Sequence, residues 1–519
     1  MAPHAPAYGN YAHAVLTAQA LRAPDRIAVV HRGRQLTYAE LNARVNRRAA
    51  VLAEVRGSAG DRVGCLLQDP LAITEVYLAA AKVGLPLAAL NPYWSDDVLA
   101  EVVRRSGCGV FVYDEGCDAV VARIRDRVPE IRVWLRVGSG SPAPNPGDAV
   151  DFDAATAAAD DREPPVGACD DDLFALFFTS GSTGLPKAVR HTHRSALAIA
   201  QLWLDIPTGP DAVFGTGPII WGVGFAAIAG PALYAGMRLA LADDFGPTGF
   251  LDAVPHHRVT HISVIPSFFV ELLGSDAHME VDLTLIRVVM LGGEPVLPSV
   301  LARIQARLPD ATVFSYYGQT EAPYSVVGVP GEAAGRAIGR ARTGGAVAVV
   351  GPDGERLVDE VGEIRLAGPH VMQGYDGHAE RTAEVLRGGW YVGGDLGVMD
   401  AGGRLTVLGR RDDALVREGH YILPGDVEDA ALALADVAEA GAVVVGSGDD
   451  KRLLLAVSPV AGRALDPDTV ATALKGRLPA YGHPDTIVVA PELPHSQDAS
   501  GGKGKLLRRE IAARWGDRR

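Results

Sequence analysis

Cysteine is scarce in this sequence, which has only four among 519 residues. Four are too few for a disulfide framework in a chain of this length, and their spacing does not match that of zinc ligands. The composition fits a reducing cytoplasm, where we expect the protein to reside. We assign no nucleophilic role to any cysteine. They are Cys65, Cys108, Cys117 and Cys169.

Excess positive charge and unbroken hydrophobic runs are also absent. The formal net charge is −14, and because nucleic-acid binding needs a basic face for phosphates, we expect no nucleic-acid partner. The basic tail at 503–519 is read as a solvated terminal helix. The apolar stretch 213–242 is interrupted by glycine, proline and arginine, so we expect a buried helix between loops and no membrane span. The first residues lack the features of a secretory signal.

The length of the chain exceeds what a single hydrophobic core usually supports, so two or more domains are expected. Through residue 340, short apolar runs alternate with helix-period segments, which predicts layered α/β sheets. Thr37 and Glu40 have the spacing of a capping box that opens one helix. The segment 139–165, rich in Gly, Pro, Ala and Asp, is expected to be a loop. The expected strands are 27–30, 62–67, 110–113, 131–135, 173–178, 262–265, 286–291 and 312–315.

The pattern of predicted strands and helices changes in the last third of the chain. Short strands with glycine-rich turns begin after residue 339 and predict a small β subdomain. After residue 409, alternating helices and strands predict a separate α+β unit. We therefore predict a large N-terminal domain over 1–409 and a smaller C-terminal domain over 410–519. The expected elements are strands 346–350, 362–366, 442–445, 453–457 and 486–490, and helices near 426–436 and 467–478.

The segment 178–187, Phe-Thr-Ser-Gly-Ser-Thr-Gly-Leu-Pro-Lys, has the composition of a triphosphate cradle. Glycine lets the backbone approach an anion, the hydroxyl groups add donors, and Lys187 adds a positive charge. The segment is not a Walker P-loop, because Lys187 stands between Pro186 and Ala188. Considered in isolation, such a loop is an ordinary turn. Its ATP-binding candidates are Thr179, Ser180, Gly181, Ser182, Thr183, Gly184 and Lys187.

As a whole, the segment 178–187 resembles the signature loop of the adenylate-forming superfamily, which includes acyl- and aryl-CoA synthetases, adenylation domains of peptide synthetases and beetle luciferase. Other segments similar to family motifs follow in the family's order over nearly the whole chain. The resemblance implies an enzyme that joins ATP and a carboxylic acid as an acyl-AMP with release of pyrophosphate. It also implies thioester formation with CoA, brought about by a mobile C-terminal domain.

The segment 316–321, Tyr-Tyr-Gly-Gln-Thr-Glu, is similar to the family's adenine and metal motif. Adenylation needs an aromatic face for adenine, a hydroxyl for the α-phosphate and a carboxylate for Mg²⁺. Tyr317, Thr320 and Glu321 supply these groups, with Gly318 between them. Thr320 and Glu321 are therefore catalytic candidates, and Glu321 is the metal-ligand candidate. The resemblance also assigns to nucleotide binding a turn that otherwise fits a strand-terminating loop equally well. This turn contains Gly292, Gly293 and Glu294.

Three segments near the C-terminus resemble the family's ribose, hinge and catalytic-lysine motifs. Asp395, in 389–397, is assigned to the ribose hydroxyls, and Arg410, in 409–413, to the same sugar. Asp412 falls on the hinge position, where a loop residue absorbs a domain rotation. Lys505, in 504–511, is assigned to the catalytic lysine that bridges the substrate carboxylate and the α-phosphate.

The sequence also departs from the family pattern. Trp221 replaces a histidine in the acid-pocket loop and provides a large, mostly apolar wall. Small residues around it favour an aromatic or bulky hydrophobic acid, and the pocket candidates are Trp221, Gly222, Gly224 and Phe225. Glu418 stands where CoA-forming members carry a small residue, in a loop that, with Gly419, lines the CoA tunnel. The segment 496–503 lengthens the approach to Lys505. The motifs therefore support adenylation more directly than thioester formation.

The expected function is that of an ATP-dependent acid–thiol ligase that uses ATP, Mg²⁺, coenzyme A and a small carboxylic acid. Two alternatives stay within enzymes: the acyl-AMP passes to a carrier protein or partner enzyme, or it meets another nucleophile. A third is a nucleotide-binding regulatory protein without turnover. The joint presence of Lys187, Glu321, Asp395, Arg410 and Lys505 argues against the third, because a decayed site is free to lose any of them.

Overall fold

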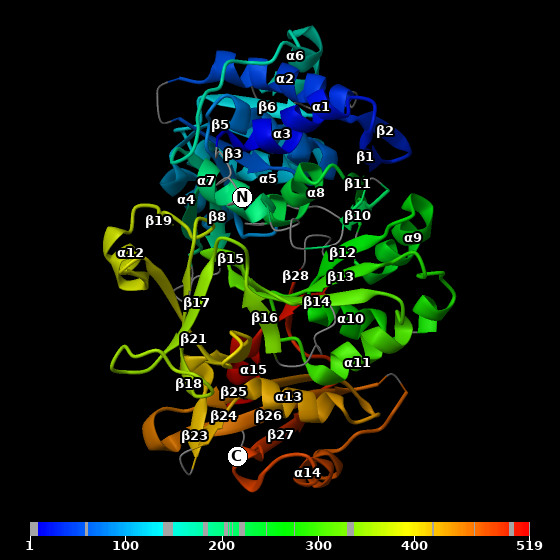
Figure 1. The fold of residues 1–519 in the computed structure, drawn as a ribbon, viewed down its shortest axis with the longest axis vertical. Helices are drawn as coiled ribbons and strands as arrows, with labels where there is room; N and C mark the ends of the chain where they lie inside the picture. Colours follow the sequence, from blue (N-terminus) through cyan, green and yellow to red (C-terminus); the bar gives the residue numbers. More distant parts are fainter. Residues whose placement is uncertain are drawn as a thin grey trace.

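The computed structural model describes residues 9–57, 61–138, 149–179, 185–201, 206, 208–209, 211–216, 224–244, 246–274, 276–329, 337–417, 420–460, 462–497 and 503–517. Two large sheets with their helices form the upper and middle parts of the molecule in Figure 1, and a smaller α+β unit lies below them. The expected α/β fold class is confirmed.

The first large sheet has eight strands in the order β19-β9-β8-β4-β3-β5-β6-β7. The pairs from β8 to β7 are parallel, whereas β9 pairs antiparallel with both β8 and β19. The strands are β3 Arg62–Leu66, β4 Leu87–Ala89, β5 Cys108–Asp114, β6 Val133–Val137, β7 Val150–Asp151, β8 Leu173–Thr179, β9 Lys187–Thr192 and β19 Gly374–Tyr375.

The second large sheet has fourteen strands, and its main path runs from β17 to β2. The neighbours from β14 through β1 are parallel, and the pairs beyond β14 are antiparallel. The parallel part comprises β1 Ile27–His31, β10 Val213–Thr216, β11 Arg238–Leu241, β12 His261–Val264, β13 Val288–Leu291 and β14 Thr312–Gln319, with β2 Arg34–Thr37 at the edge. The antiparallel part comprises β15 Ala322–Val327, β16 Ala337–Ala341, β17 Ala346–Val350, β18 Val361–Ala367, β20 Leu386–Arg387, β21 Trp390–Met399 and β22 Leu405–Arg410. The β subdomain expected from the sequence is thus hydrogen-bonded to the α/β sheet.

Two helices that pack beside each other, α2 and α3, begin at caps that the sequence supplies. Thr37 and Glu40 form the expected capping box of α2 Tyr38–Val55. Asp69 caps α3 Pro70–Lys82, whose residues are all buried. Other helices of this part are α4 Asp96–Ser106, α5 Asp118–Ile124, α7 His193–Ala200, α8 Gly230–Tyr234, α9 Pro247–His257, α10 Pro266–Leu272, α11 Pro298–Arg307 and α12 Ala379–Val385.

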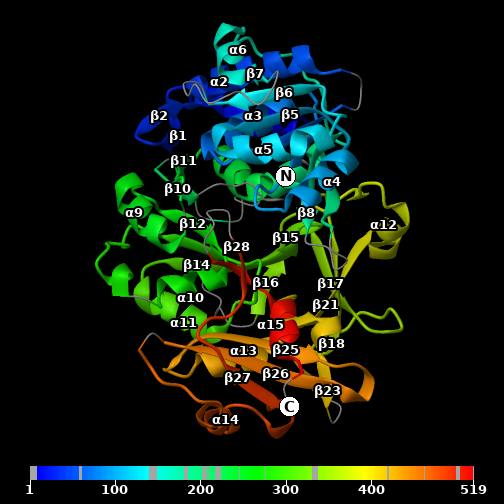
Figure 2. The same cartoon turned by 180° about the vertical axis from the view of Figure 1, so that it is seen from behind.

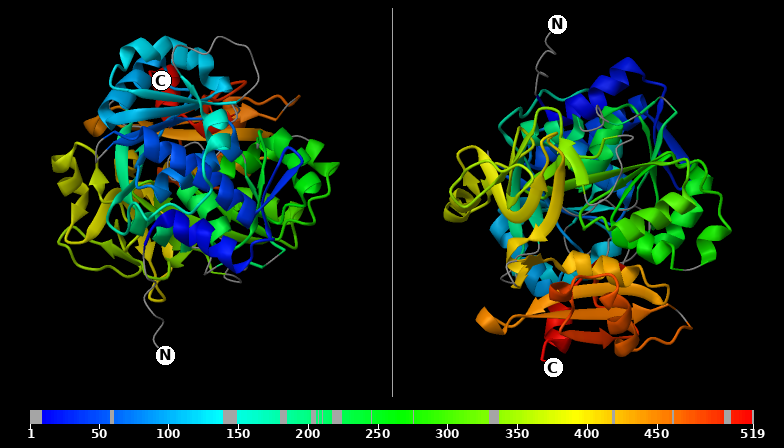
Figure 3. Two further views of the ribbon diagram at one scale, coloured as in Figure 1. Left: turned by 90° about the horizontal axis from the view of Figure 1, so that it is seen from above. Right: turned by 60° about the horizontal axis from the view of Figure 1, so that its bottom comes forward.

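The C-terminal residues form a three-stranded sheet covered by helices, which appears in orange and red at the bottom of Figures 1 and 2 and comes forward in the right panel of Figure 3. Its elements are α13 Pro424–Leu432, β25 Val437–Val445, β26 Arg452–Pro459, α14 Pro467–Lys475, β27 Thr486–Val489 and α15 Arg508–Trp515. The hairpin of β28 His495–Gln497 and β29 Lys503–Leu506 extends from this unit toward β14 in Figure 2. The domain boundary at 409/410 stays a prediction.

Two expectations about local structure need correction. The segment 213–242 contains the expected buried helix, as η5 Phe225–Ala229 and α8 Gly230–Tyr234, but its described ends are the strands β10 and β11, which pair in parallel with each other, where loops were expected. The expected loop 139–165 contains β7 and the helix α6 Phe152–Ala158, which starts because the Asp151 side chain accepts a hydrogen bond from the Ala154 amide. Among the described helices, none combines the length and the apolar character needed to cross a membrane.

Candidate active site

Two of the phosphate-loop candidates, Thr179 and Lys187, flank the connecting loop of the β8–β9 hairpin. Thr179, the last residue of β8, is the register partner of Lys187, the first residue of β9. The ammonium of Lys187 lies 5.4 Å from the ring centroid of Tyr375 in β19. Ser180, Gly181, Ser182, Thr183 and Gly184 lie outside the described residues. The hairpin thus places Thr179 and Lys187 at the two ends of the predicted phosphate loop.

Thr320 and Glu321 form a tight turn between the antiparallel strands β14 and β15. Gly318 precedes this turn at a crowded point, because a Cβ there would lie 2.5 Å from the Tyr324 amide nitrogen. The Glu321 carboxylate is buried, and its Oε1 accepts a 2.7 Å hydrogen bond from the Tyr375 hydroxyl. Tyr375 therefore connects the candidate metal ligand Glu321 with the phosphate-loop cation Lys187.

Burial and the adjacent Glu321 carboxylate raise the pKa of Tyr375, so its hydroxyl stays a donor at neutral pH. One carboxylate oxygen of Glu321 has this protein partner, and the second accepts no hydrogen bond from the described residues. A carboxylate beside hydroxyl groups is a donor set that suits a hard cation such as Mg²⁺. The residues present at this turn therefore fit the metal that the motif implies.

Pairing of β21 with β22 makes Asp395 and Arg410 register partners. The Asp395 carboxylate accepts several hydrogen bonds. Its Oδ2 accepts bonds of 2.6 Å from both the Tyr317 hydroxyl and the Gln319 amide. Arg410 donates to Asp395 Oδ1 at 3.3 Å and to the Gly393 carbonyl oxygen at 2.7 Å. The Tyr391 hydroxyl donates to Gln319 at 2.5 Å. The adenine, ribose and hinge-proximal candidates thus form one network.

This network limits how Asp395 could meet a ribose. A carboxylate offers about four acceptor positions, and three donors from the protein already use Asp395. One acceptor position is left, so two ribose hydroxyls could bond to Asp395 only if one of the three donors, Tyr317, Gln319 or Arg410, moved away. Burial, followed by the Asp395 charge, raises the pKa of Tyr317 well above its ordinary value.

The turn after β13 carries Gly292, Gly293 and Glu294. A Cβ on Gly292 would lie 2.4 Å from the Tyr316 ring, and Gly293 has a φ of +79°, so both positions favour glycine. Glu294 accepts a 3.0 Å hydrogen bond from the Ser267 amide at the start of α10. The turn packs against the aromatic end of β14, as the nucleotide-binding prediction requires.

The acid-pocket candidates are described only in part. Trp221 and Gly222 lie outside the described residues. Gly224 precedes the short π-helix η5 Phe225–Ala229. The Phe225 ring is fully buried and stacks on Tyr77, with centroids 4.2 Å apart. In this structure Phe225 is thus a core residue, and its place in the pocket wall stays a prediction.

The predicted catalytic-lysine segment lies in the C-terminal unit. Lys505 belongs to β29, and its side chain lies outside what the structure describes. Leu506 and Arg508, which follow it, line a cavity of about 90 Å³ together with Ser267 and Glu294. Arg508 donates to the buried Glu428 carboxylate at 2.8 Å. The Lys505 strand therefore approaches the turn after β13.

The hinge candidate Asp412 lies in the 3₁₀ turn η7 Arg411–Asp413, and its side chain is 81% exposed. This turn links β22 to β23 Leu415–Arg417 and β24 His420–Ile422. The tunnel candidates Glu418 and Gly419, which stand between β23 and β24 in the sequence, lie outside the described residues.

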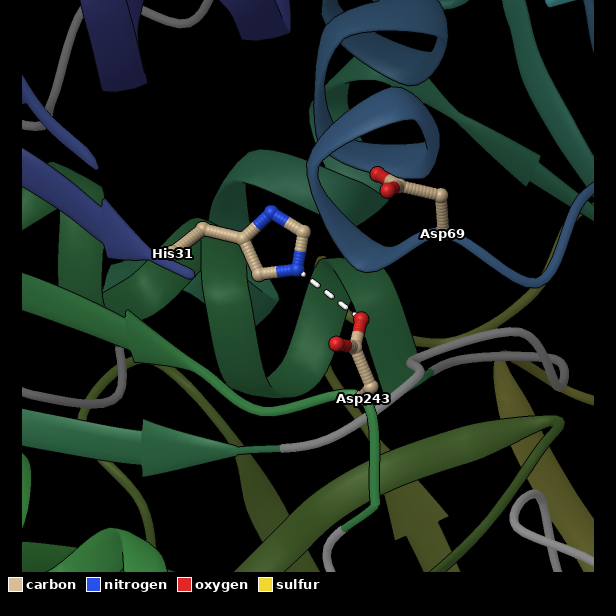
Figure 4. Close-up of side chains that lie close together, drawn as sticks. All are labelled: His31, Asp69 and Asp243. Carbon is tan, nitrogen blue, oxygen red and sulfur yellow. Dashed lines mark hydrogen bonds and ion pairs between the residues drawn. The ribbon is translucent and has the colours of Figure 1, made fainter. Parts of the chain in front are cut away.

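A second group of possible metal ligands lies elsewhere, at the ends of β1 and β11 and the start of α3. His31, Asp69 and Asp243 offer ligand atoms within 4.8 Å of one another (Figure 4). His31 Nε2 lies 3.0 Å from Asp243 Oδ1, and Arg32 bonds to Asp243 at 2.8 Å and approaches Asp69 at 3.3 Å. The Arg32 guanidinium already balances both carboxylates, so we interpret the group as an ion-pair network.

Sequence reasoning missed four residues of the site: His191, Gln319, Tyr375 and Tyr391. Gln319 stood in a quoted motif as an unassigned position, and Tyr391 stood in the string that carries Asp395. Nothing in the sequence near Tyr375 marks it, since it reaches Glu321 through the pairing of β19 with β9.

Comparison with known proteins gives consistent results. The sequence model of the AMP-binding enzyme family matches residues 16–376. Feruloyl-CoA synthase from Amycolatopsis sp is 31% identical over 96% of this chain and 98% of its own length. Fatty acid–[acyl-carrier-protein] ligase ScoC from Streptomyces coeruleorubidus is 29% identical over 95% of this chain and 94% of its own. The structure of the amide bond synthetase McbA from Marinactinospora thermotolerans superimposes with a TM-score of 0.83 at 25% identity, covering 97% of this chain and 99% of that one.

Proposed function

This chain belongs to the AMP-binding enzyme family, and we propose that it is an ATP-dependent ligase that converts a carboxylic acid to an acyl-AMP and then to a CoA thioester. The observation that carries the proposal is the convergence of Lys187 and Glu321 on Tyr375, beside the Asp395–Arg410 pair. Adenylation needs a cation for the phosphates, a carboxylate for a metal and a carboxylate for the ribose.

In the first half-reaction, a carboxylate oxygen of the acid attacks the α-phosphorus of ATP, the bond to the β-phosphate breaks and pyrophosphate leaves. Lys187 and the loop 180–184 hold the departing phosphates, and Thr320 donates to the α-phosphate. Glu321 holds Mg²⁺, which when bound neutralises charge on the pyrophosphate. Lys505 bridges the acid carboxylate and the α-phosphate. Positioning and charge stabilisation supply the catalysis without a covalent enzyme intermediate.

In the second half-reaction, the CoA sulfur attacks the acyl carbonyl carbon, the bond to AMP breaks and the thiol proton is released. We propose that the domain 410–519 rotates about Asp412 between the two steps and brings Glu418 and Gly419 to the thiol path. The exposed turn at Asp412, between two strands, supports this assignment because none of its three residues is buried.

For the acid we propose an aromatic or bulky hydrophobic carboxylic acid that contacts Trp221, Gly222 and Gly224. Support comes from the large, mostly apolar side chain that the sequence has at position 221, Trp221, and from the relative that is named feruloyl-CoA synthase. We also propose that the enzyme works in the cytoplasm. The four cysteines are free thiols, which accords with a reducing compartment.

A second candidate function differs only in the acceptor of the acyl group. ScoC is named as a ligase for acyl carrier protein, and McbA as an amide bond synthetase, and both are similar to this chain over nearly its whole length. Glu418 in the proposed thiol path also favours an acceptor other than CoA, because CoA is itself polyanionic.

The test is a panel of aromatic, alicyclic and straight-chain acids assayed for pyrophosphate release with Mg²⁺ and ATP. We expect release that depends on the acid and is fastest with aromatic or bulky members. CoA consumption with the best acid then distinguishes a CoA ligase from an enzyme that uses another acceptor. No release with any acid would refute the proposed function.

A further inference from the structure

His191 lies near the end of β9, the strand that starts at Lys187, and its side chain is fully buried. Its Nε2 lies 2.7 Å from the carbonyl oxygen of Thr320, in the turn that presents Thr320 and Glu321. Its Nδ1 lies 3.0 Å from the Ser195 hydroxyl oxygen. One imidazole thus connects the phosphate-loop strand with the catalytic turn, across 129 positions of sequence.

The partners of the ring determine which nitrogen carries the proton. A carbonyl oxygen only accepts hydrogen bonds, so Nε2 must donate to Thr320. Burial lowers the pKa of His191 to about 4, so the ring is neutral at physiological pH and Nδ1 is an acceptor. The Ser195 hydroxyl has a single proton, and both Nδ1 of His191, at 3.0 Å, and the Thr192 carbonyl oxygen, at 3.1 Å, lie within its reach. The Thr320 carbonyl oxygen therefore determines the tautomer of His191, and Ser195 is a partner compatible with it.

Among the described residues, two further hydrogen bonds hold Glu321 in this turn. The Glu321 carbonyl oxygen accepts a 2.8 Å hydrogen bond from the Met372 amide, and the Glu321 side chain accepts one from Tyr375. Tyr375 is in register with Val189, also in β9. The bond from His191 is the side-chain contact that fixes the peptide between Thr320 and Glu321, and it comes from the same strand that supports Tyr375.

We infer that His191 is a positioning residue: it holds the Thr320–Glu321 turn at a fixed place relative to Lys187 through the hydrogen bond that its Nε2 donates to Thr320. The inference rests on the proposed function, in which Glu321 binds Mg²⁺ and Thr320 contacts the α-phosphate. Residues that orient metal ligands typically change metal affinity or activity by about 10- to 100-fold when replaced.

The test compares three substitutions of His191. In His191→Gln the side-chain amide nitrogen can occupy the position of Nε2 and donate to Thr320, whereas the amide of His191→Asn corresponds to Nδ1 and falls short. His191→Leu removes both polar atoms. We expect His191→Asn and His191→Leu to raise the Mg²⁺ concentration for half-maximal pyrophosphate release and to lower kcat. The ratio of kcat to that Mg²⁺ concentration should fall by about 10- to 100-fold, and the KM for the acid should not change. Gln should recover most of the loss.

His193 provides the matched control, because it is also a buried histidine and bonds to the Tyr11 amide at 3.1 Å, away from the turn. His193→Asn should lower the melting temperature but leave the Mg²⁺ dependence as in wild type. If His191→Asn and His191→Leu show the wild-type Mg²⁺ dependence, or if their losses only follow the melting temperature as in the control, the inference is wrong. Wild-type protein that releases no pyrophosphate with any acid would instead refute the proposed function, so the two failures are distinguishable.

Discussion

Replacing Glu321 with glutamine tests the metal-ligand assignment with little disturbance of the fold. The Oε1 atom of Glu321 accepts a 2.7 Å hydrogen bond from Tyr375, and the carbonyl oxygen of a glutamine of the same shape can accept this bond. The change removes the negative charge and leaves the packing intact. We expect the free energy of unfolding to fall by about 1 kcal/mol, the difference between a charged and a neutral acceptor.

The effect on turnover should be far larger than the effect on stability. Loss of one preorganised charge costs about 10²- to 10³-fold in kcat, and loss of a metal ligand should raise the Mg²⁺ concentration for half-maximal rate by at least about 10-fold. The assay is pyrophosphate release at saturating ATP and acid, titrated with Mg²⁺, beside a urea unfolding curve of the same variant. High Mg²⁺ should restore part of the rate.

Tyr375→Phe is the control, because it deletes the hydroxyl donor and keeps the Glu321 carboxylate. It should lower the rate less than Glu321→Gln and shift the Mg²⁺ dependence less. If Glu321→Gln keeps the wild-type rate at ordinary Mg²⁺, or if Tyr375→Phe is equally impaired, the carboxylate has a structural role and the metal assignment is wrong.

Three further predictions address the catalytic lysine, the thiol path and the buried histidines. Lys505→Ala should slow acyl-AMP formation by about 10²- to 10³-fold and spare thiolysis of supplied acyl-AMP in single-turnover experiments; equal loss in both steps would contradict the assignment. Glu418→Gly should accelerate the conversion of preformed acyl-AMP by CoA, and fast wild-type thiolysis with no gain in the variant would show that Glu418 does not obstruct the thiol. Burial lowers the pKa of His191 and of His193 from 6.5 to about 4, so between these values the unfolded chain binds protons that the folded chain excludes. The two neutral histidines therefore contribute their full stability above pH 6.5, and this contribution is lost as the pH falls to 4. The free energy of unfolding should fall by about 1.4 kcal/mol per pH unit for each histidine, and a urea midpoint that stays constant over this range would contradict the prediction.

Local sequence patterns predicted much of the fold and the residues of each motif. Strand β8 follows from its apolar run, and the start of α2 follows from Thr37 and Glu40. Asp395 and Arg410 were selected from separate strings, and the pairing of β21 with β22 explains why both belong to one site. For these features, the information lies within a few consecutive residues.

The contacts between motifs were beyond such reasoning. His191 meets Thr320 and Tyr375 meets Glu321 through pairing of distant strands, which local propensity does not specify. The hydrogen bonds that Tyr317 and Gln319 donate to Asp395 likewise depend on how β14 lies beside β21. The strands β10 and β11 at the ends of 213–242, where loops were expected, were missed for the same reason, because they are short and are defined by their neighbours in the sheet.

The central claim is that the carboxylate of the acid attacks the α-phosphorus of ATP. The most direct measurement uses an acid labelled with ¹⁸O in both carboxylate oxygens, together with ATP, Mg²⁺ and CoA, followed by mass spectrometry of the products. Attack at the α-phosphorus places one labelled oxygen in AMP, with unlabelled pyrophosphate as the other phosphate product. Labelled inorganic phosphate with ADP, or AMP without label, would contradict the claim.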